Sequence, residues 1–156
     1  PVKPIIPTAY TKDSFTVDGY DIEIRGTTGL LAHRPYLWIP ANKTILGNIA
    51  VFGNIHLWTA DTQSDESQLA WISQLEGMLT LNPESVIPGH MKEGTALTVD
   101  NIKYSIDYLK YFKIAKESSK NSVELIEKIS AKYPNLNKSS IALSIGAKVH
   151  KGEMKW

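Results

Sequence analysis

The sequence has no cysteine among its 156 residues. Disulfide frameworks, thiolate metal sites and cysteine nucleophiles are therefore excluded, and the chain is compatible with any redox compartment. Long apolar runs are also missing, because none approaches the ~20 residues that a membrane-spanning helix needs. The opening "PVKPIIPTAY" has three prolines and no apolar core, so it is not a signal peptide. We expect no membrane partner and assign no compartment.

An excess of charge of either sign is missing as well. Lysine and arginine total 17 and aspartate and glutamate total 16, which leaves a net charge of +1. The basic residues form no long run, so we expect no nucleic-acid partner. Hydrophobic residues make up 42% of the chain, as in a folded globular protein, and the length suits a single core.

Short strands are predicted in the first ninety residues. Apolar and polar residues alternate from 15 to 24 on both sides of Asp18-Gly19, which is the preferred pair for a type I′ hairpin turn. Further short strands are predicted in "YLWIP", which Pro40 ends, in "ILG", and at 85–87. The stretch 48–58 shows no clean period and is expected to be loop with fragments of strand or helix.

Helices dominate the rest. Ser64 can cap a helix that runs to Asn82-Pro83, with an apolar face formed by Leu69, Ile72, Leu75 and Leu79. Three more helices are predicted at 98–118, 122–133 and 139–150. The fold class is therefore α/β. We divide the chain into a sheet-and-helix part, residues 1–96, and a helical extension, residues 97–156, which packs on the same core or forms a small subdomain.

Among the four histidines, His90 has an unusual setting. It follows Pro88-Gly89 at the end of a predicted strand; proline restricts the backbone and glycine permits a tight turn. Such a rigid mounting suits a metal ligand, although a metal site needs three or four ligands. His150 lies in a lysine-rich helix end and is interpreted as a residue without a site role.

Three segments resemble the metallo-β-lactamase superfamily of metal-dependent hydrolases. They are the hairpin at 15–24, "YLWIPANKTILGN" at 36–48, and 59–90, which ends in "PESVIPGH". Together they cover roughly the first hundred residues. The resemblance implies the carboxyl-terminal half of an αβ/βα sandwich, with short, mostly antiparallel strands and a helix, followed by a three-helix tail.

The resemblance also implies a metal site. His90 matches the family's last metal-binding histidine, and His33 lies close enough to join it after a loop shift. Asn48 falls where the family usually has a metal-bridging aspartate, and an amide is a poor bridge. In the intact protein, zinc or a similar divalent ion would activate water to attack an ester, amide or phosphate-type bond.

The segment "HLWTADTQSDE" supplies the remaining candidates. Asp61 would lie at the metal edge and, with Asn48, is our candidate catalytic position. His56 and Trp58 would line the site of a small-molecule substrate. The alternative is structural, with Asp61 capping the helix region and Trp58 packed in the core. The stripe of Tyr104, Tyr108 and Tyr111 favours a core or subdomain interface.

The family's H-x-H-x-D-H motif, which supplies most metal ligands, is missing from this sequence. Together with the proline start, its absence favours a piece whose partner is the amino-terminal half of the fold. We expect this chain alone to bind no metal tightly, to be inactive, and to self-associate or domain-swap through its exposed sheet edge or apolar face. The alternative is a non-catalytic binding or interaction module derived from the same fold. Asn48 favours the module, and His90 favours the hydrolase.

Overall fold

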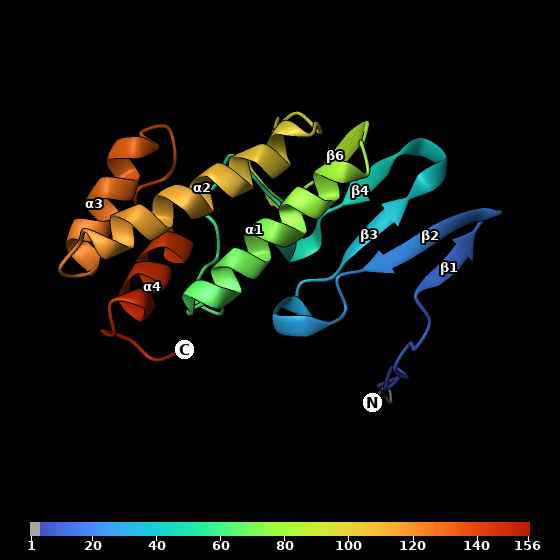
Figure 1. Cartoon of the computed structure of the whole chain (residues 1–156), viewed down its shortest axis with the longest axis horizontal. Coiled ribbons are helices and arrows are strands. Elements are labelled where there is room, and N and C mark those ends of the chain that lie inside the picture. The colour runs from blue at the N-terminus through green and yellow to red at the C-terminus, as the bar shows by residue number, and fades with distance from the viewer. Residues whose placement is uncertain (1–3) are drawn as a thin grey trace.

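The computed structural model describes residues 4–156 (Figure 1). Within this range the strands are β1 (Ser14–Val17), β2 (Tyr20–Arg25), β3 (Tyr36–Ile39), β4 (Thr44–Leu46), β5 (Phe52–Gly53), β6 (Ser85–Ile87) and β7 (His90–Met91). The α-helices are α1 (Asp65–Thr80), α2 (Asp100–Glu117), α3 (Ser122–Lys132) and α4 (Ile141–His150). In this range no helix is both long enough and apolar enough to cross a bilayer.

The main sheet has five strands in the order β1-β2-β3-β4-β6. Neighbouring strands are antiparallel except β4 and β6, which run parallel and are joined through α1. The predicted hairpin is confirmed: Asp18 and Gly19 both have positive φ, 51° and 84°, as a type I′ turn requires. The fold is mixed α/β with a mostly antiparallel sheet, as the sequence predicted.

One face of the sheet is covered by helices. Trp38, Ile45 and Val86 lie side by side across β3, β4 and β6, and all are buried. They belong to one core cluster that continues into α1 and α2. Figure 1 shows α1 crossing the sheet with α2 beside it.

The opposite face carries a second apolar row. Ile24, Leu37, Leu46 and Ile87 are neighbours on four successive strands. These four side chains are half-buried and lie outside the core cluster. They line a shallow apolar hollow of about 410 Å³ together with Pro88 and other neighbours. We call this row of four the open-face row.

Helix α1 begins where the sequence predicted but is rotated differently. Ser64 caps it, since its Oγ accepts the Ser67 N–H at 3.0 Å. The prediction that Leu69 faces the core was wrong, because its side chain is 53% exposed. The indole of Trp71 takes the core position and donates to the Ala50 carbonyl at 2.8 Å. The residues of α1 that are buried are Gln68, Trp71, Leu75 and Met78.

Helix α2 joins the sheet layer to the last two helices. Its predicted face is confirmed, since Ile102, Ile106, Leu109 and Phe112 are all buried. The core cluster runs without a break from the sheet through α2 to Leu125 of α3 and Leu143 of α4. Figure 1 shows α3 and α4 on the far side of α2 from the sheet.

Candidate functional site

His90 lies on β7, which pairs with β5 in a second, two-stranded parallel sheet. In this register His90 is opposite Phe52, and the two rings stack with centroids 5.5 Å apart. The side chain is exposed on its other side. The backbone of β5 and the ring of Phe52 together hold the imidazole in place.

Gly89 brings the His90 segment against Asn48. Its N–H donates to the carbonyls of Asn48 and Val51, at 3.0 and 3.2 Å. A Cβ on Gly89 would lie only 2.0 Å from the Asn48 oxygen, so no other residue fits. The sequence analysis expected this glycine because it permits a tight turn, whereas the structure requires it because the Asn48 backbone approaches so closely. The side chain of Asn48 donates to the Pro35 carbonyl at 3.1 Å, and its backbone is left-handed, with φ 44°.

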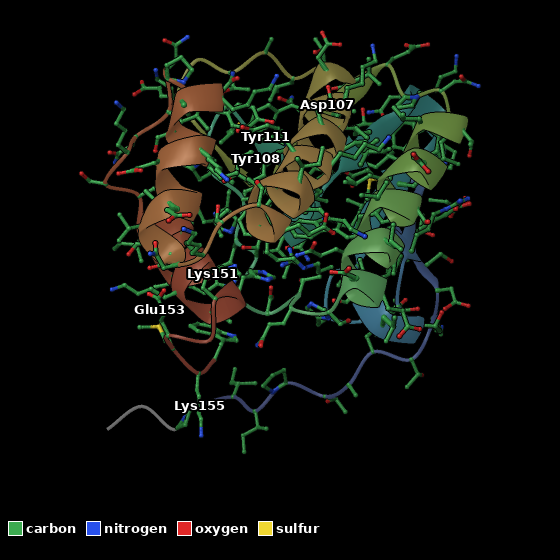
Figure 2. All side chains as sticks on the ribbon, turned by 60° about the vertical axis from the view of Figure 1, so that its left-hand side comes forward. Asp107, Tyr108, Tyr111, Lys151, Glu153 and Lys155 are labelled. Carbon is green, nitrogen blue, oxygen red and sulfur yellow. The ribbon has the colours of Figure 1, made fainter. Side chains whose placement is uncertain are left out.

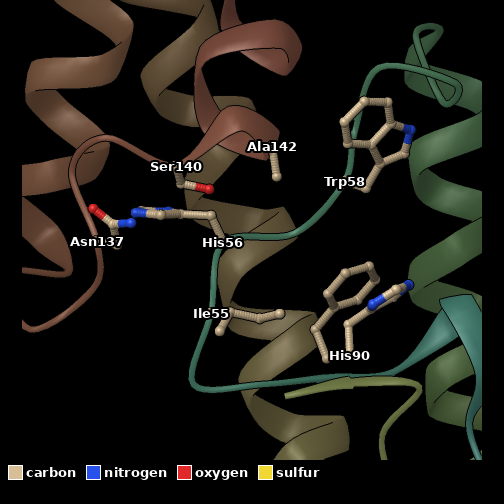
Figure 3. A pocket seen from close by; sticks show the side chains of 8 residues that line it. Ile55, His56, Trp58, His90, Asn137, Ser140 and Ala142 are labelled. Carbon is tan, nitrogen blue, oxygen red and sulfur yellow. The ribbon is translucent and has the colours of Figure 1, made fainter. Parts of the chain in front are cut away.

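A cavity of about 320 Å³ opens beside His90 (Figure 3). We call it the His56 pocket. Its lining residues are Phe52, Ile55, His56, Trp58, His90, Asn137, Ser140 and Ala142. The fold thus gathers three sequence candidates, His56, Trp58 and His90, around one space. The assignment of His56 and Trp58 to substrate binding stays a prediction.

His56 is a buried polar residue of this pocket and is only 3% exposed. Its Nδ1 lies 2.9 Å from the hydroxyl of Tyr108, which is itself fully buried. Burial lowers the pKa of His56 to about 4, so the imidazole is neutral at pH 7. Burial also raises the pKa of the Tyr108 hydroxyl well above its usual value, so the phenol keeps its proton.

The hydrogen bond between these two groups determines the tautomer. If Tyr108 donates to Nδ1, the proton of His56 is on Nε2, and Nε2–H alone lacks a partner. If His56 donated instead, both Nε2 and the phenolic proton would be unpaired in a buried space, which costs more. The first arrangement is favoured. Nε2 is buried without a hydrogen-bond partner among the described residues, so the pocket contains an unused donor.

Arg34, which the sequence analysis missed, organises the loops next to the pocket. It is fully buried, and its guanidinium donates to the carbonyls of Ile49 and Trp58 and to Asp61 Oδ1, the last at 2.6 Å. The guanidinium also lies 3.8 Å from the ring centroid of Trp71. Burial lowers the pKa of Arg34, and Asp61 opposes this effect. An arginine within the apolar "GLLAHRPYLWI" was the signal that could have identified it.

Asp61 therefore forms an ion pair with a buried arginine of the fold. One carboxylate oxygen pairs with Arg34, and the other lies 3.7 Å from His33 Nε2. The carboxylate does not cap α1, because Ser64 does so. A catalytic role for Asp61 stays a prediction, as does the role of Asn48.

The described residues do not by themselves fit a metal ion. Over 4–156, no three histidine, aspartate or glutamate side chains are grouped so that they could hold one. His90 stacks on Phe52, while His33 Nε2 lies 3.7 Å from the Asp61 carboxylate. The described residues therefore offer His90 no group of further ligands.

The helical extension contributes to the pocket in a way that the sequence did not reveal. Asn137 and Ser140, just ahead of α4, form part of its wall. The tyrosine stripe of α2, two of whose members, Tyr108 and Tyr111, are labelled in Figure 2, is an interface, as predicted. Tyr104 donates to the Ile55 carbonyl at 2.6 Å, and the Tyr108 hydroxyl contacts His56. His150 is largely buried and bonds to the Thr59 carbonyl at 3.0 Å, so it ties α4 to the 56–62 loop.

Comparison with known proteins gives a partial structural likeness. No protein-family model matches the sequence. No curated protein matches it either. Among solved structures, the chain is similar to a metallo-beta-lactamase from Pontibacter korlensis, with a TM-score of 0.48 and 20% sequence identity. The match covers 66% of this chain and 47% of that one, so the chain spans about half the length of the structure it resembles.

Proposed function

We propose that this chain is one part of a metallo-β-lactamase-like, metal-dependent hydrolase. His90 would supply one ligand to a site that residues outside the chain complete. The observation that carries the proposal is the contact of Gly89 with Asn48, with N–H to carbonyl oxygen at 3.0 Å. It brings together the two positions at which such a site would be built, one after β4 and one after β6. Ligands commonly bind at strand ends of this kind.

The open-face row supports a missing partner. Ile24, Leu37, Leu46 and Ile87 form a continuous apolar row that lies outside the core cluster. Folded proteins generally cover such a surface. We propose that the amino-terminal half of the fold packs here, and that isolated copies of this chain associate through the same face.

Metal analysis and activity assays on a longer protein test the proposal. A longer protein, expressed from a reading frame that includes upstream sequence, would be purified beside this chain, and the zinc content of both would be measured. Turnover would be tested on an ester, a β-lactam and a phosphodiester. We expect zinc and turnover in the longer protein, and loss of both in its His90→Ala variant.

Met91→Ala is the matched control, because Met91 is the next residue on β7 and is also exposed. It should retain zinc and activity. A longer protein that binds no zinc, or a His90→Ala variant that behaves as the parent, would count against the hydrolase.

A second candidate is a binding module without catalysis. The His56 pocket favours it, because the pocket contains a buried donor whether or not a metal is present. Ligand binding by a longer protein that shows no turnover on any of the three substrates would favour the module.

A further inference from the structure

The polar groups of the His56 pocket gather on one side. Figure 3 shows His56, Asn137 and Ser140 together there, while Trp58 and His90 lie opposite. The buried Nε2–H of His56 lacks an acceptor among the described residues. An unpaired buried donor destabilises the protein, and an acceptor from a ligand would remove that cost.

The N-terminus of α4 opens onto the same side. Ser140 and Ala142, at the start of this ten-residue helix, line the pocket. Ser140 occupies the N-cap position, but its hydroxyl makes no capping hydrogen bond, and the first turn contains no acidic residue. The free N–H groups and the positive end of the helix dipole there favour an anion.

The remaining walls indicate what kind of anion fits. Phe52, Ile55, Trp58 and Ala142 are apolar, and neither lysine nor arginine is among the lining residues in the part of the chain that the structure describes. A phosphate dianion would require more positive charge than one neutral imidazole and a helix end provide. A single carboxylate needs fewer donors, and an apolar body would fill the rest of the cavity.

We propose that the His56 pocket binds a small apolar or aromatic molecule through its carboxylate. The carboxylate accepts a hydrogen bond from His56 Nε2 and lies at the N-terminus of α4, and the apolar body extends toward Trp58 and His90. Under the proposed function this pocket forms one wall of the substrate site, and the carboxylate names the class of ligand that it binds. It therefore rests on that proposal for its role, although the binding itself needs no metal.

Binding of phenylacetate to this chain in metal-free buffer tests the inference. Titration would be followed by NMR shifts of the pocket residues, with 2-phenylethanol as the uncharged analogue and inorganic phosphate as a second anion. We expect saturable binding of phenylacetate, binding of 2-phenylethanol weaker by about tenfold, and no saturation with phosphate.

Two pairs of variants assign the effect. His56→Phe retains a ring and removes the donor, and should weaken phenylacetate binding about tenfold, whereas His56→Gln retains an N–H and should bind more tightly than His56→Phe. Ser140→Asp places a carboxylate at the α4 N-cap and should abolish binding without lowering the melting temperature. Ser139→Asp adds the same charge one residue outside the pocket lining and should still bind.

Three results would overturn the inference: no saturable binding of phenylacetate, equal affinity for 2-phenylethanol, or unchanged affinity in Ser140→Asp. Because the titration contains no metal and measures no turnover, its failure leaves the hydrolase proposal standing. Loss of zinc or turnover in the longer protein would, in the same way, leave this binding result standing.

Discussion

The two faces of the five-stranded sheet carry similar apolar rows but have different surroundings. On one face, Trp38, Ile45 and Val86 are at most 6% exposed beneath the helices. On the other, the open-face row is only half-buried and lies outside the core. Strands with apolar residues on both faces are typical of sheets that are covered on both sides. The difference indicates that the sequence of β3, β4 and β6 is suited to a second covering layer.

The covered side also contains the buried polar contacts, so removing Arg34 should have the largest effect on stability. Arg34→Met leaves the Asp61 carboxylate without its buried partner and the Ile49 and Trp58 carbonyls without their donor. We expect the free energy of unfolding to fall by about 3–5 kcal/mol, measured by urea denaturation.

Arg25→Met is the control for this variant. Arg25 pairs with Glu23 at 2.6 Å, but both side chains are more than a third exposed, so its loss should cost less than about 1 kcal/mol. Equal losses in the two variants would mean that the buried cluster does not stabilise the covered side.

Truncation on the two faces should give unequal losses. Ile45 and Leu46 are adjacent on β4 and point to opposite faces. Ile45→Ala leaves a cavity in the core and should cost about 2–4 kcal/mol, while Leu46→Ala should cost about 1 kcal/mol. Chemical denaturation of both variants at low protein concentration measures the difference. A similar cost for Leu46→Ala would show that the open face is already covered in solution.

Acid should destabilise the covered side through His56. Its pKa is about 4 when folded, below the unfolded value near 6.5, so the unfolded chain binds more protons between these pH values. The contribution of neutral His56 to stability is therefore fully present above pH 6.5. The free energy of unfolding should fall by roughly 2–3 kcal/mol as the pH drops toward 4. Burial also lowers the pKa of His150, which acts in the same direction.

Unfolding free energies of the parent and of His56→Gln, measured from pH 4 to 7, test this expectation. The variant should show a shallower slope between pH 6.5 and 4, because glutamine does not titrate. Identical slopes would show that His56 is not the group responsible.

The smallest effect on stability, but a direct effect on assembly, is expected on the open face. Leu46→Lys should change the free energy of unfolding by no more than about 1 kcal/mol. It should also prevent the self-association that we propose for this chain, because a charge would enter the apolar row. Sedimentation velocity over a range of concentrations measures this.

Leu69→Lys is the matched control, since Leu69 is an exposed leucine on α1 in the covering layer. It should associate as the parent does. A parent chain that stays monomeric at high concentration would remove the open face as an association surface.

Local signals in the sequence were enough to predict much of the fold. Asp18-Gly19 predicted the hairpin, Ser64 the start of α1, and the spacing of Ile102, Ile106 and Leu109 the buried face of α2. Each depends on residues close together in the chain. The rotation of α1 was not predicted, because it depends on a contact distant in sequence. The large indole of Trp71 is buried and donates a hydrogen bond to the Ala50 carbonyl, so the helix turns Trp71 and not Leu69 toward the core.

The candidate site was only partly predictable, for the same reason. The sequence picked out His56, Trp58 and His90, and these do line one pocket. It did not reveal the polar wall from Asn137 and Ser140, which lie more than eighty residues further along the chain than His56. Wall residues from different elements become neighbours only when the helices pack.

The sequence by itself determined the strands of the main sheet, the four α-helices and the place of His90 shortly after β6, because backbone geometry and apolar periodicity are local properties. Only the tertiary structure decided that β5 pairs with β7 and that Gly89 meets the Asn48 backbone. It also decided that Arg34 is buried between Ile49, the 58–62 loop and α1, and that His56 has a donor without a partner among the described residues. Those features depend on close packing between segments far apart in the chain.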